Sequence, residues 1–342
     1  MIEFIREAGR GPRGCRDLSF AQAEAAAGEM LDGRATDAQV GALLLSLRVK
    51  GETGDEIAGF ARALSGRVAD GNATTIRPGL VDCAGPHDGR KSFAATIPVS
   101  VLCALAGVPT VLHSSPSLPP KDGVGLGEIL AGLGLGGAAF GVERAVADLG
   151  RHALAFVDAE TAVPGLGALR RIRTEIGVRS VWNHAEKLAD FCGAEIRIVG
   201  VHHATVFGAL QRSAELLGNR MALFQGNDGS EDLPTHRKSV IVRLGEGEAV
   251  RTEVDPEALG LGAEAGPVLE AEGQVSAIRA VLEGDTEAGA EAFRKQVLLN
   301  VAARLWVAGA APSLTEGALR ARELLDSGRA WGHLRAWAGN AV

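Results

Sequence analysis

A short glycine-containing loop carries the first residue types that could do chemistry. After a short apolar segment, Gly85 and Gly89 enclose Pro86, His87 and Asp88. A strand that leads through a glycine turn into a helix is a common phosphate-binding arrangement, because backbone N–H groups and the helix dipole favour an anion. Here the proline removes one N–H donor, and the aspartate carboxylate repels phosphate. The loop therefore has the architecture of a phosphate site with little of its chemistry.

A histidine and an acidic pair are further candidates for a catalytic or metal site. His113 lies near the end of the apolar segment 110–114, where it could act as a general acid or donate to a phosphate. Histidines at such positions are more often capping or core residues. Glu231 and Asp232 could bind Mg²⁺ through their carboxylate oxygens, or could form a charged turn. Both alternatives remain open for each of these sites.

Basic residues are concentrated in two segments. The first is an N-terminal run that consists of Arg6, Arg10, Arg13 and Arg16. The second lies in one expected helix, on which positions 170 and 173 share a face, and consists of Arg170, Arg171 and Arg173. Such segments could follow a nucleic-acid backbone, or could be ordinary solvated helix faces. Together they predict a local basic patch.

The composition limits the classes of function. The chain has 342 residues, of which 46% are hydrophobic, so it can bury a large core and form two domains. A formal net charge of −7, 4% aromatic residues and the absence of Tyr argue against nucleic-acid binding over the whole surface. The four cysteines lack metal-site spacing, the N-terminus lacks a signal-peptide pattern, and no apolar run reaches membrane-spanning length. These features predict a soluble, cytoplasmic protein.

Two patterns of secondary structure follow one another along the chain. Three capping boxes predict an N-terminal helical domain over residues 1–71, and they pair Ser19 with Gln22, Thr36 with Gln39, and Thr53 with Glu56. From residue 80, short apolar runs alternate with helical patterns, which is typical of an α/β sheet covered by helices. Residues 80–164 and 191–342 are assigned to this α/β domain. Residues 165–190 interrupt it with two helices and no strand, and 245–273 is expected to be an exposed loop or ribbon.

Four segments resemble anthranilate phosphoribosyltransferase, and they occur in the right order over nearly the whole chain. They are residues 33–64, 168–183 (ALRRIRTEIGVRSVWN), 216–233 (LLGNRMALFQGNDGSEDL) and 313–337. The resemblance implies a small all-helical N-terminal domain and a larger α/β domain with a central sheet flanked by helices. It also implies that residues 165–190 pack back onto the helical domain, that a cleft separates the domains, and that the helical domain forms a homodimer.

The resemblance also assigns site residues. The family's pyrophosphate loop falls on the glycine loop, its phosphate motif keeps only the hydroxyl of Thr96, and its Lys-His-Gly-Asn-Arg motif keeps only His113, the catalytic candidate. Arg173 aligns with the arginine that binds the aromatic acid, and Glu231 and Asp232 align with the Mg²⁺-binding acidic pair. The candidates for substrate or phosphate binding are Gly85, Asp88, Gly89, Lys91, Thr96, Lys121 and Arg173. Each lost phosphate contact removes roughly 1.5–3 kcal/mol, which predicts a degraded site for phosphoribosyl pyrophosphate.

The chain is also similar to a paralogous group, the YbiB-type proteins, which share this fold, lack the transferase activity and bind nucleic acid without sequence preference. The matching segments are 7–19, 89–109 and 177–188. The similarity implies a non-catalytic nucleic-acid-binding protein, with candidate contacts at Arg6, Arg10, Arg13, Arg16, Arg170, Arg171, Arg173, Arg179 and Lys187. One alternative is a Mg²⁺-dependent phosphoribosyl or related pentosyl transferase that acts on a phosphoribosyl pyrophosphate-type molecule. The other is a protein-binding scaffold.

Overall fold

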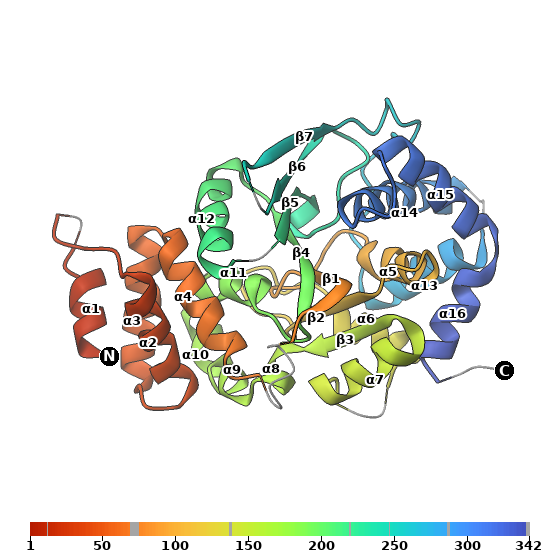
Figure 1. Cartoon of the computed structure of the whole chain (residues 1–342). Coiled ribbons are helices and arrows are strands. Elements are labelled where there is room, and N and C mark those ends of the chain that lie inside the picture. Colours follow the sequence, from red (N-terminus) through yellow and green to blue (C-terminus); the bar gives the residue numbers. More distant parts are fainter. Residues whose placement is uncertain are drawn as a thin grey trace.

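Four helices form the N-terminal part of the structure (Figure 1). They are α1 (Ile2–Ala8), α2 (Phe20–Leu31), α3 (Asp37–Lys50) and α4 (Gly54–Ser65). The three predicted capping boxes are confirmed, because the N-cap and N3 side chains of α2, α3 and α4 each accept the other residue's backbone N–H. The computed structural model describes residues 1–11, 13–68, 75–136, 139–218, 220–245, 247–285 and 288–339. Residues 69–71 of the predicted helical domain therefore lie outside the described residues.

A seven-stranded sheet follows, in the spatial order β3-β2-β1-β4-β5-β6-β7. Its strands are β1 (Arg77–Ala84), β2 (Thr110–Ser114), β3 (Leu154–Asp158), β4 (Ala194–Val201), β5 (Arg220–Gln225), β6 (Ser239–Leu244) and β7 (Val250–Val254). The first five strands in this order are parallel, and β6 and β7 add an antiparallel ribbon at one edge. The predicted architecture, a helical domain followed by an α/β domain, is confirmed.

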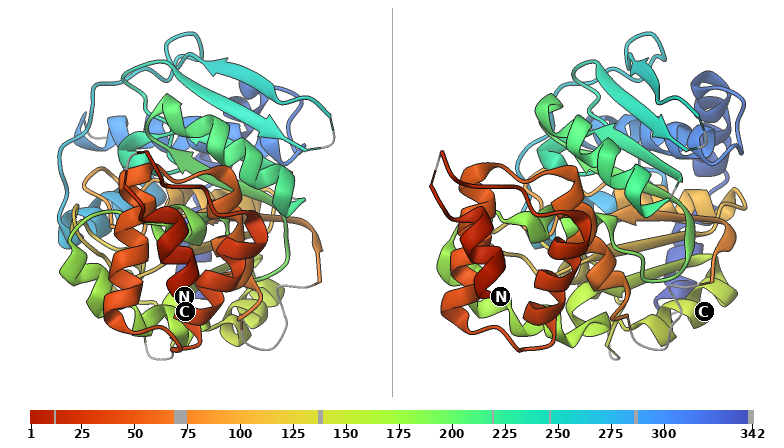
Figure 2. Two further views of the ribbon diagram at one scale, coloured as in Figure 1. Left: turned by 90° about the vertical axis from the view of Figure 1, so that its left-hand side faces the viewer. Right: turned by 60° about the vertical axis from the view of Figure 1, so that its left-hand side comes forward.

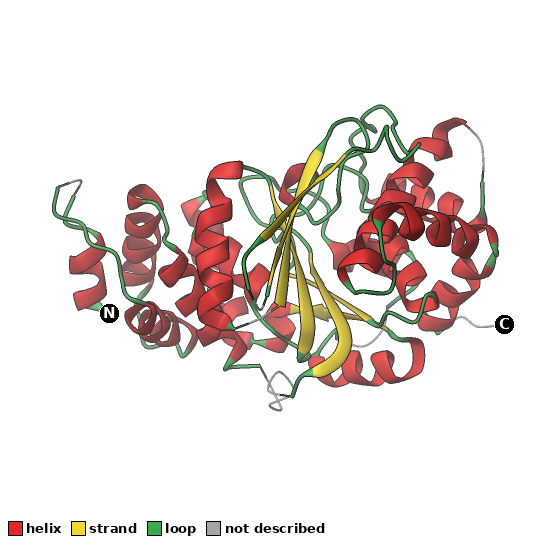
Figure 3. Ribbon diagram, turned by 45° about the horizontal axis from the view of Figure 1, so that its top comes forward, coloured by secondary structure: helices red, strands yellow, loops and turns green. Residues whose placement is uncertain are grey.

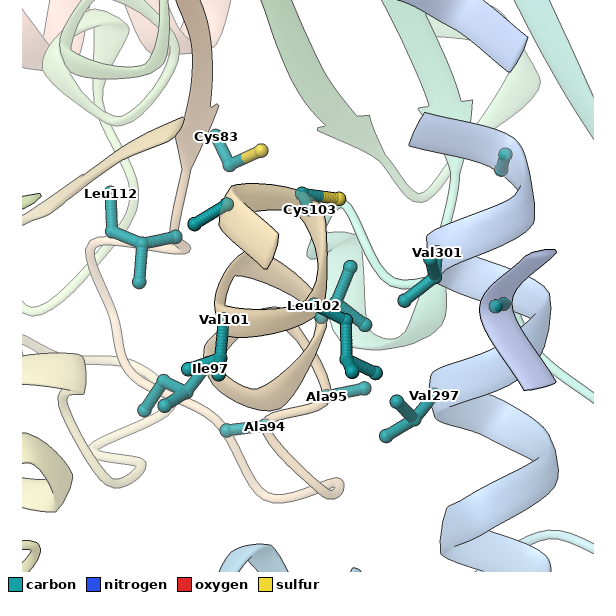
Figure 4. Close-up of a cluster of buried hydrophobic side chains, with 14 of the residues drawn as sticks. Cys83, Ala94, Ala95, Ile97, Val101, Leu102, Cys103, Leu112, Val297 and Val301 are labelled. Atoms are coloured by element: carbon teal, nitrogen blue, oxygen red, sulfur yellow. The ribbon is translucent and has the colours of Figure 1, made fainter. Parts of the chain in front are cut away.

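The sheet separates two hydrophobic cores, because successive side chains of a strand point to opposite faces. On β2, Val111 belongs to one core and Leu112 to the other. Helices cover both faces of the sheet (Figure 3). Leu112 lies in the core formed with α5 and the C-terminal helices, where α5 packs against α14; Figure 4 shows this contact around Leu102 and Val301. Val111 lies in the core shared with the N-terminal helices.

The remaining helices connect the strands and close the C-terminal side. They are α5 (Thr96–Leu105), α6 (Leu126–Gly132), α7 (Val142–His152), α8 (Ala159–Ala162), α9 (Pro164–Ala168), α10 (Arg170–Ile176), α11 (Val181–Leu188), α12 (Phe207–Leu217), α13 (Ala271–Glu283), α14 (Ala288–Val307), α15 (Leu314–Asp326) and α16 (Arg329–Trp337). Helices α9, α10 and α11 contact α2, α3 and α4, and both views of Figure 2 show these elements together. In the described ranges, no helix has the length and apolar character needed to cross a membrane.

The parallel strands bring four loops to one edge of the sheet. The loops that follow β1, β2, β4 and β5 all begin at carboxyl ends of neighbouring parallel strands. In open α/β sheets, ligands bind at this edge. Helices α3 and α11 lie across from it, and together with the loops they enclose the candidate site.

Candidate functional site

A cavity of about 330 Å³ lies where these loops meet α3 and α11. Its wall contains four cationic side chains, which come from both parts of the structure: Arg48, Lys121, Arg179 and Lys187. The only carboxylates in the described lining are Asp88 and Asp228, and four histidines also line the cavity: His87, His184, His202 and His203. A cavity with four cations and two carboxylates favours an anionic ligand.

Asp88 is held by two of these cations. Its carboxylate lies 3.2 Å from Lys121 Nζ and 2.6 Å from Arg179 Nη2. Burial disfavours the charged carboxyl, but Lys121 and Arg179 outweigh burial, so the pKa of Asp88 is lowered. An internal anion therefore already neutralises part of the cavity's positive charge.

The two lysines of the cavity are fixed by backbone carbonyls. Lys121 Nζ donates to the carbonyls of Gly89 (3.0 Å) and Asp228 (2.8 Å). Lys187 Nζ donates to the carbonyls of Gly200 (3.1 Å) and Gly229 (2.6 Å). Burial and the nearby Lys121 lower the pKa of Lys187 to about 8. The lysines are thus positioned before any ligand arrives, and the charge of Lys187 falls as the pH rises past about 8.

His113, the predicted catalytic residue, lies beneath the cavity in the core. Its Nδ1 is 2.7 Å from Asp82 Oδ1 on β1, and its Nε2 is 3.0 Å from the backbone carbonyl of Glu186. Burial disfavours the imidazolium, but Asp82 outweighs it and the pKa of His113 is raised. Both ring nitrogens are bonded within the protein, as expected for a structural histidine.

Arg173, predicted to bind an aromatic acid or nucleic acid, lies in a buried network around Glu186. Arg173 is 5% exposed, and its Nη2 lies 2.6 Å from Glu186 Oε1. The other carboxylate oxygen accepts a hydrogen bond from Ser115 Oγ (2.6 Å) and lies 2.7 Å from His87 Nδ1. Burial opposes ionisation of Glu186, but Arg173 and His87 keep its pKa well below its usual range. The network therefore holds a carboxylate and a guanidinium as a fixed pair.

The acidic pair faces two arginines. Arg90 Nη2 donates to Glu231 Oε1 at 2.7 Å, and Arg90 Nη1 donates to Asp232. Arg304 Nη2 donates to Asp232 Oδ1 at 3.1 Å. All four side chains are buried. Mg²⁺ needs open oxygen ligands and usually retains several waters, so a dehydrated pair that already faces two guanidinium groups does not fit this ion.

Thr96 lies at the start of α5 and contacts the same cluster. Its backbone N–H donates to Asp232 Oδ2 at 3.1 Å, and its hydroxyl accepts from Arg304 Nη2 at 3.2 Å. A helix N-terminus attracts an anion. Here the anion is the carboxylate of Asp232, in the place where the sequence predicted a phosphate.

The two predicted phosphate-loop glycines make close contacts with neighbouring segments. A Cβ on Gly89 would lie 2.2 Å from the Gly123 carbonyl oxygen, and a Cβ on Gly85 would lie 2.7 Å from Leu126 Cδ1. Gly89 also has a φ of 74°. Packing alone therefore explains both glycines. Lys91, the neighbouring candidate, has an exposed side chain.

The exposed stripe predicted on helix α10 is not formed, because its arginines have carboxylate partners. Arg170 pairs with Glu160 at 2.6 Å, Arg171 pairs with Asp37 and Glu175, and Arg173 is buried. The four N-terminal arginines, Arg6, Arg10, Arg13 and Arg16, are all exposed on the surface. Glu7 contacts two of them, Arg10 at 3.8 Å and Arg16 at 3.9 Å. Of the predicted nucleic-acid contacts, the N-terminal arginines and the cavity residues Arg179 and Lys187 thus remain as candidates.

Sequence reasoning missed Arg90 and Arg304. Arg304 is the only charged residue of the apolar run 297–307, and Asn300 precedes it by one helical turn. A lone charge in an apolar helix indicates a buried pair, because an isolated buried charge is costly. No comparable signal distinguishes Arg90 from Lys91 beside it.

Comparison with known proteins gives the family. Residues 2–66 match the model of the glycosyl transferase family helical bundle domain, and residues 77–331 match that of its a/b domain. Anthranilate phosphoribosyltransferase of Methylobacterium nodulans is 32% identical over 92% of this chain and 91% of that protein. The enzyme of Anaeromyxobacter sp. (strain K) is 34% identical over 93% of each chain.

Solved structures show the same fold. The crystal structure of anthranilate phosphoribosyltransferase from Thermus thermophilus has a TM-score of 0.83 at 24% identity, over 98% of each chain. The Saccharomyces cerevisiae enzyme in complex with PRPP and Mg has a TM-score of 0.80 at 17% identity, over 99% of this chain and 97% of that one. The chain therefore belongs to the glycosyl transferase family that includes the anthranilate phosphoribosyltransferases.

Proposed function

We propose that this protein binds nucleic acid through its phosphates at the cation-lined cavity and does not transfer phosphoribosyl groups. The observation that carries the proposal is the contrast between two neighbouring regions. The cavity keeps four cationic side chains, whereas the acidic pair and the start of α5 are filled by internal ion pairs. Phosphate can be bound in the first region, but a metal-bound pyrophosphate has no open ligands in the second.

The shape of the cavity suits a chain of phosphates better than a single buried one. Arg48 and Arg179 form its rim, with side chains that are 46% and 43% exposed, whereas Lys121 lies deeper and is 11% exposed. Exposed arginines can follow a backbone, because the guanidinium forms paired hydrogen bonds with phosphate oxygens. The chain has no Tyr and few aromatic residues, so phosphate contacts rather than base stacking account for affinity, and binding has no sequence preference.

Salt dependence is the first expected result. If four phosphates are contacted, affinity for single-stranded nucleic acid falls about 50-fold between about 50 and 200 mM salt, because bound counterions are released. Fluorescence anisotropy with labelled single-stranded DNA and RNA measures it.

The double variant Arg48→Ala/Arg179→Ala is expected to weaken binding at least tenfold, since each charged contact contributes about 1.5–3 kcal/mol.

The matched control is Arg279→Ala, which removes an exposed arginine of α13 on the other side of the sheet (Figure 1). It is expected to bind like the wild type. Absence of binding at low salt, or equal affinity in the double variant and the control, would contradict the proposal.

The transferase reaction itself is the second candidate. The relatives of 30–34% identity are named as anthranilate phosphoribosyltransferases and match over nine-tenths of the chain. Calorimetry with phosphoribosyl pyrophosphate and Mg²⁺, followed by an assay with anthranilate, separates the candidates. Heat of binding at millimolar ligand supports the transferase, and its absence supports the nucleic-acid proposal.

We also propose that the helical domain forms a homodimer. An apolar groove runs between α1 and α3, and the exposed side chains beside it include Val49 (85%) and Leu45 (43%). These residues would be covered by the same face of a second copy, which is how a two-fold dimer buries an apolar patch.

Val49→Glu tests the dimer. A carboxylate at the centre of this face is expected to raise the dimer dissociation constant at least about tenfold, because its burial is unfavourable without a partner. Light scattering after gel filtration measures the mass. Val268→Glu, at another exposed valine, is the control and should leave the mass unchanged. A monomeric wild type would contradict the dimer.

A further inference from the structure

A charge-balanced cluster lies below the cavity, between the sheet and the C-terminal helices. It contains two carboxylates, Glu231 and Asp232, and two guanidinium groups, Arg90 and Arg304. We propose that these two guanidinium groups take the place of a divalent cation at the acidic pair, so that this position is permanently occupied by the protein's own charges. The inference holds whichever ligand the cavity binds.

Three of the four carboxylate oxygens are already engaged. Arg90 places one nitrogen on each carboxylate, at Glu231 Oε1 and at Asp232. Asp232 Oδ2 accepts in addition from the backbone N–H of Thr96, and Asp232 Oδ1 accepts from Arg304. Both oxygens of Asp232 and one of Glu231 are therefore bound by protein donors. Two unit charges on the guanidinium groups equal the charge of one Mg²⁺.

The arginines are themselves fixed in place. Asn300, one turn before Arg304 on α14, accepts from Arg304 Nη1 through its side chain (3.1 Å) and its carbonyl (3.3 Å). The side-chain amide of Asn300 also accepts from the backbone N–H of Leu233 (2.8 Å) and donates to the Leu233 carbonyl (3.0 Å). Leu233 directly follows the acidic pair in the sequence. Arg304 also lies over the Phe224 ring, 5.9 Å from its centroid. Asn300 thus holds both Arg304 and the loop that carries the acidic pair in place.

Charge and hydration exclude a metal from this cluster. Arg90 and Arg304 are always protonated, so an added Mg²⁺ would leave the cluster with excess positive charge in a buried place. Mg²⁺ also gives up its waters reluctantly, and these side chains are shielded from solvent. A metal could enter only if a guanidinium group left.

The test measures metal binding directly on the full-length chain. Mn²⁺, a paramagnetic substitute for Mg²⁺, is titrated in and followed by electron paramagnetic resonance. The wild type is expected to show no saturable binding at low millimolar Mn²⁺, and the same melting temperature in Mg²⁺ as in EDTA. Saturable binding to the wild type that is lost in Asp232→Asn would overturn the proposal.

Arg90→Gln provides the second arm, because it removes one internal cation and leaves the pair with excess negative charge. This variant is expected to melt at a lower temperature, to bind Mn²⁺, and to recover about 2–4 °C in saturating Mg²⁺. Arg197→Gln is the matched control, because it breaks another buried pair, that of Arg197 with Asp190 at 2.5 Å. It should lower the melting temperature without any recovery in Mg²⁺.

A folded Arg90→Gln variant that gains no Mn²⁺ binding would also overturn the proposal. If that variant does not fold, the Mn²⁺ titration of the wild type decides.

Discussion

Replacing Glu186 by glutamine is expected to lower the free energy of unfolding by about 3–5 kcal/mol, because it leaves the buried Arg173 without its counter-charge. Glu186 is fully buried, and its carboxylate contacts three side chains that are buried themselves: Arg173, His87 and Ser115. Urea unfolding at neutral pH measures the change. Glu175→Gln, which breaks the exposed pair with Arg171, is the control and should change stability by no more than about 0.5 kcal/mol.

The same carboxylate sets a pH dependence. The pKa of Glu186 in the folded state lies below its ordinary value of 4.5, so its ionisation stabilises the fold at all pH values above 4.5. That contribution is lost as the pH falls from 4.5 toward the folded-state pKa. The wild type should therefore lose stability steeply below about pH 4.5, and Glu186→Gln should lose less over the same range. Parallel losses in both proteins, or a neutral-pH change under about 1 kcal/mol, would show that the network does not hold this charge.

Gly89→Ala is expected to destabilise the protein by about 2–5 kcal/mol, because it combines backbone strain with overpacking. The φ of 74° is unfavourable for alanine, and the new Cβ would lie 2.2 Å from the carbonyl oxygen of Gly123. The matched control is Gly107→Ala, which has a φ of 84° but open space around the Cβ. The control is expected to cost only about 1–2 kcal/mol, the strain alone.

The clash would also strain the backbone hydrogen bonds on both sides of Gly89. Backbone bonds join this loop to the loop after β2: Gly123 N–H donates to Asp88 (3.0 Å), and Arg90 and Val124 exchange a pair of bonds (2.9 and 2.8 Å). Asp88 faces the cavity, and Arg90 belongs to the buried cluster. Urea unfolding of both variants measures the difference, and equal losses for Gly89→Ala and Gly107→Ala would show that the close approach of the two loops is unimportant.

The local features of the fold were predictable because they depend on neighbours in sequence. Ser19, Thr36 and Thr53 cap helices through residues three positions away, and the alternation of apolar runs with helices predicts the parallel sheet. The resemblance to the family added the order of the domains. Strand β7 was expected only as part of an exposed loop or ribbon, because an edge strand with one solvated face carries few apolar residues.

The site was predicted less completely, because charge partners are chosen by tertiary contacts. Arg171 and Arg173 are two positions apart, yet one is exposed and the other is buried against Glu186. Thr96 keeps the hydroxyl of a phosphate motif, but the anion it meets is Asp232, 136 residues further along the chain. Another signal lies in β1: Asp82 is the only charged residue of its apolar part, residues 80–84, and its partner His113 lies on the neighbouring strand β2.

The buried arginine–carboxylate cluster also sets the order in which the chain can fold during synthesis. Its two guanidinium groups, those of Arg90 and Arg304, come from opposite ends of the α/β domain. The hydrogen bond from Arg304 to the Thr96 hydroxyl joins residues that are 208 positions apart in the sequence. While a ribosome is still making α14, the acidic loop lacks Arg304, although Arg90 and the Thr96 backbone have already been made. Contacts over such distances close slowly, because long-range loop closure must precede them. The helical domain, which depends on local caps, can form early, whereas the sheet domain completes its folding only after α14 has left the ribosome.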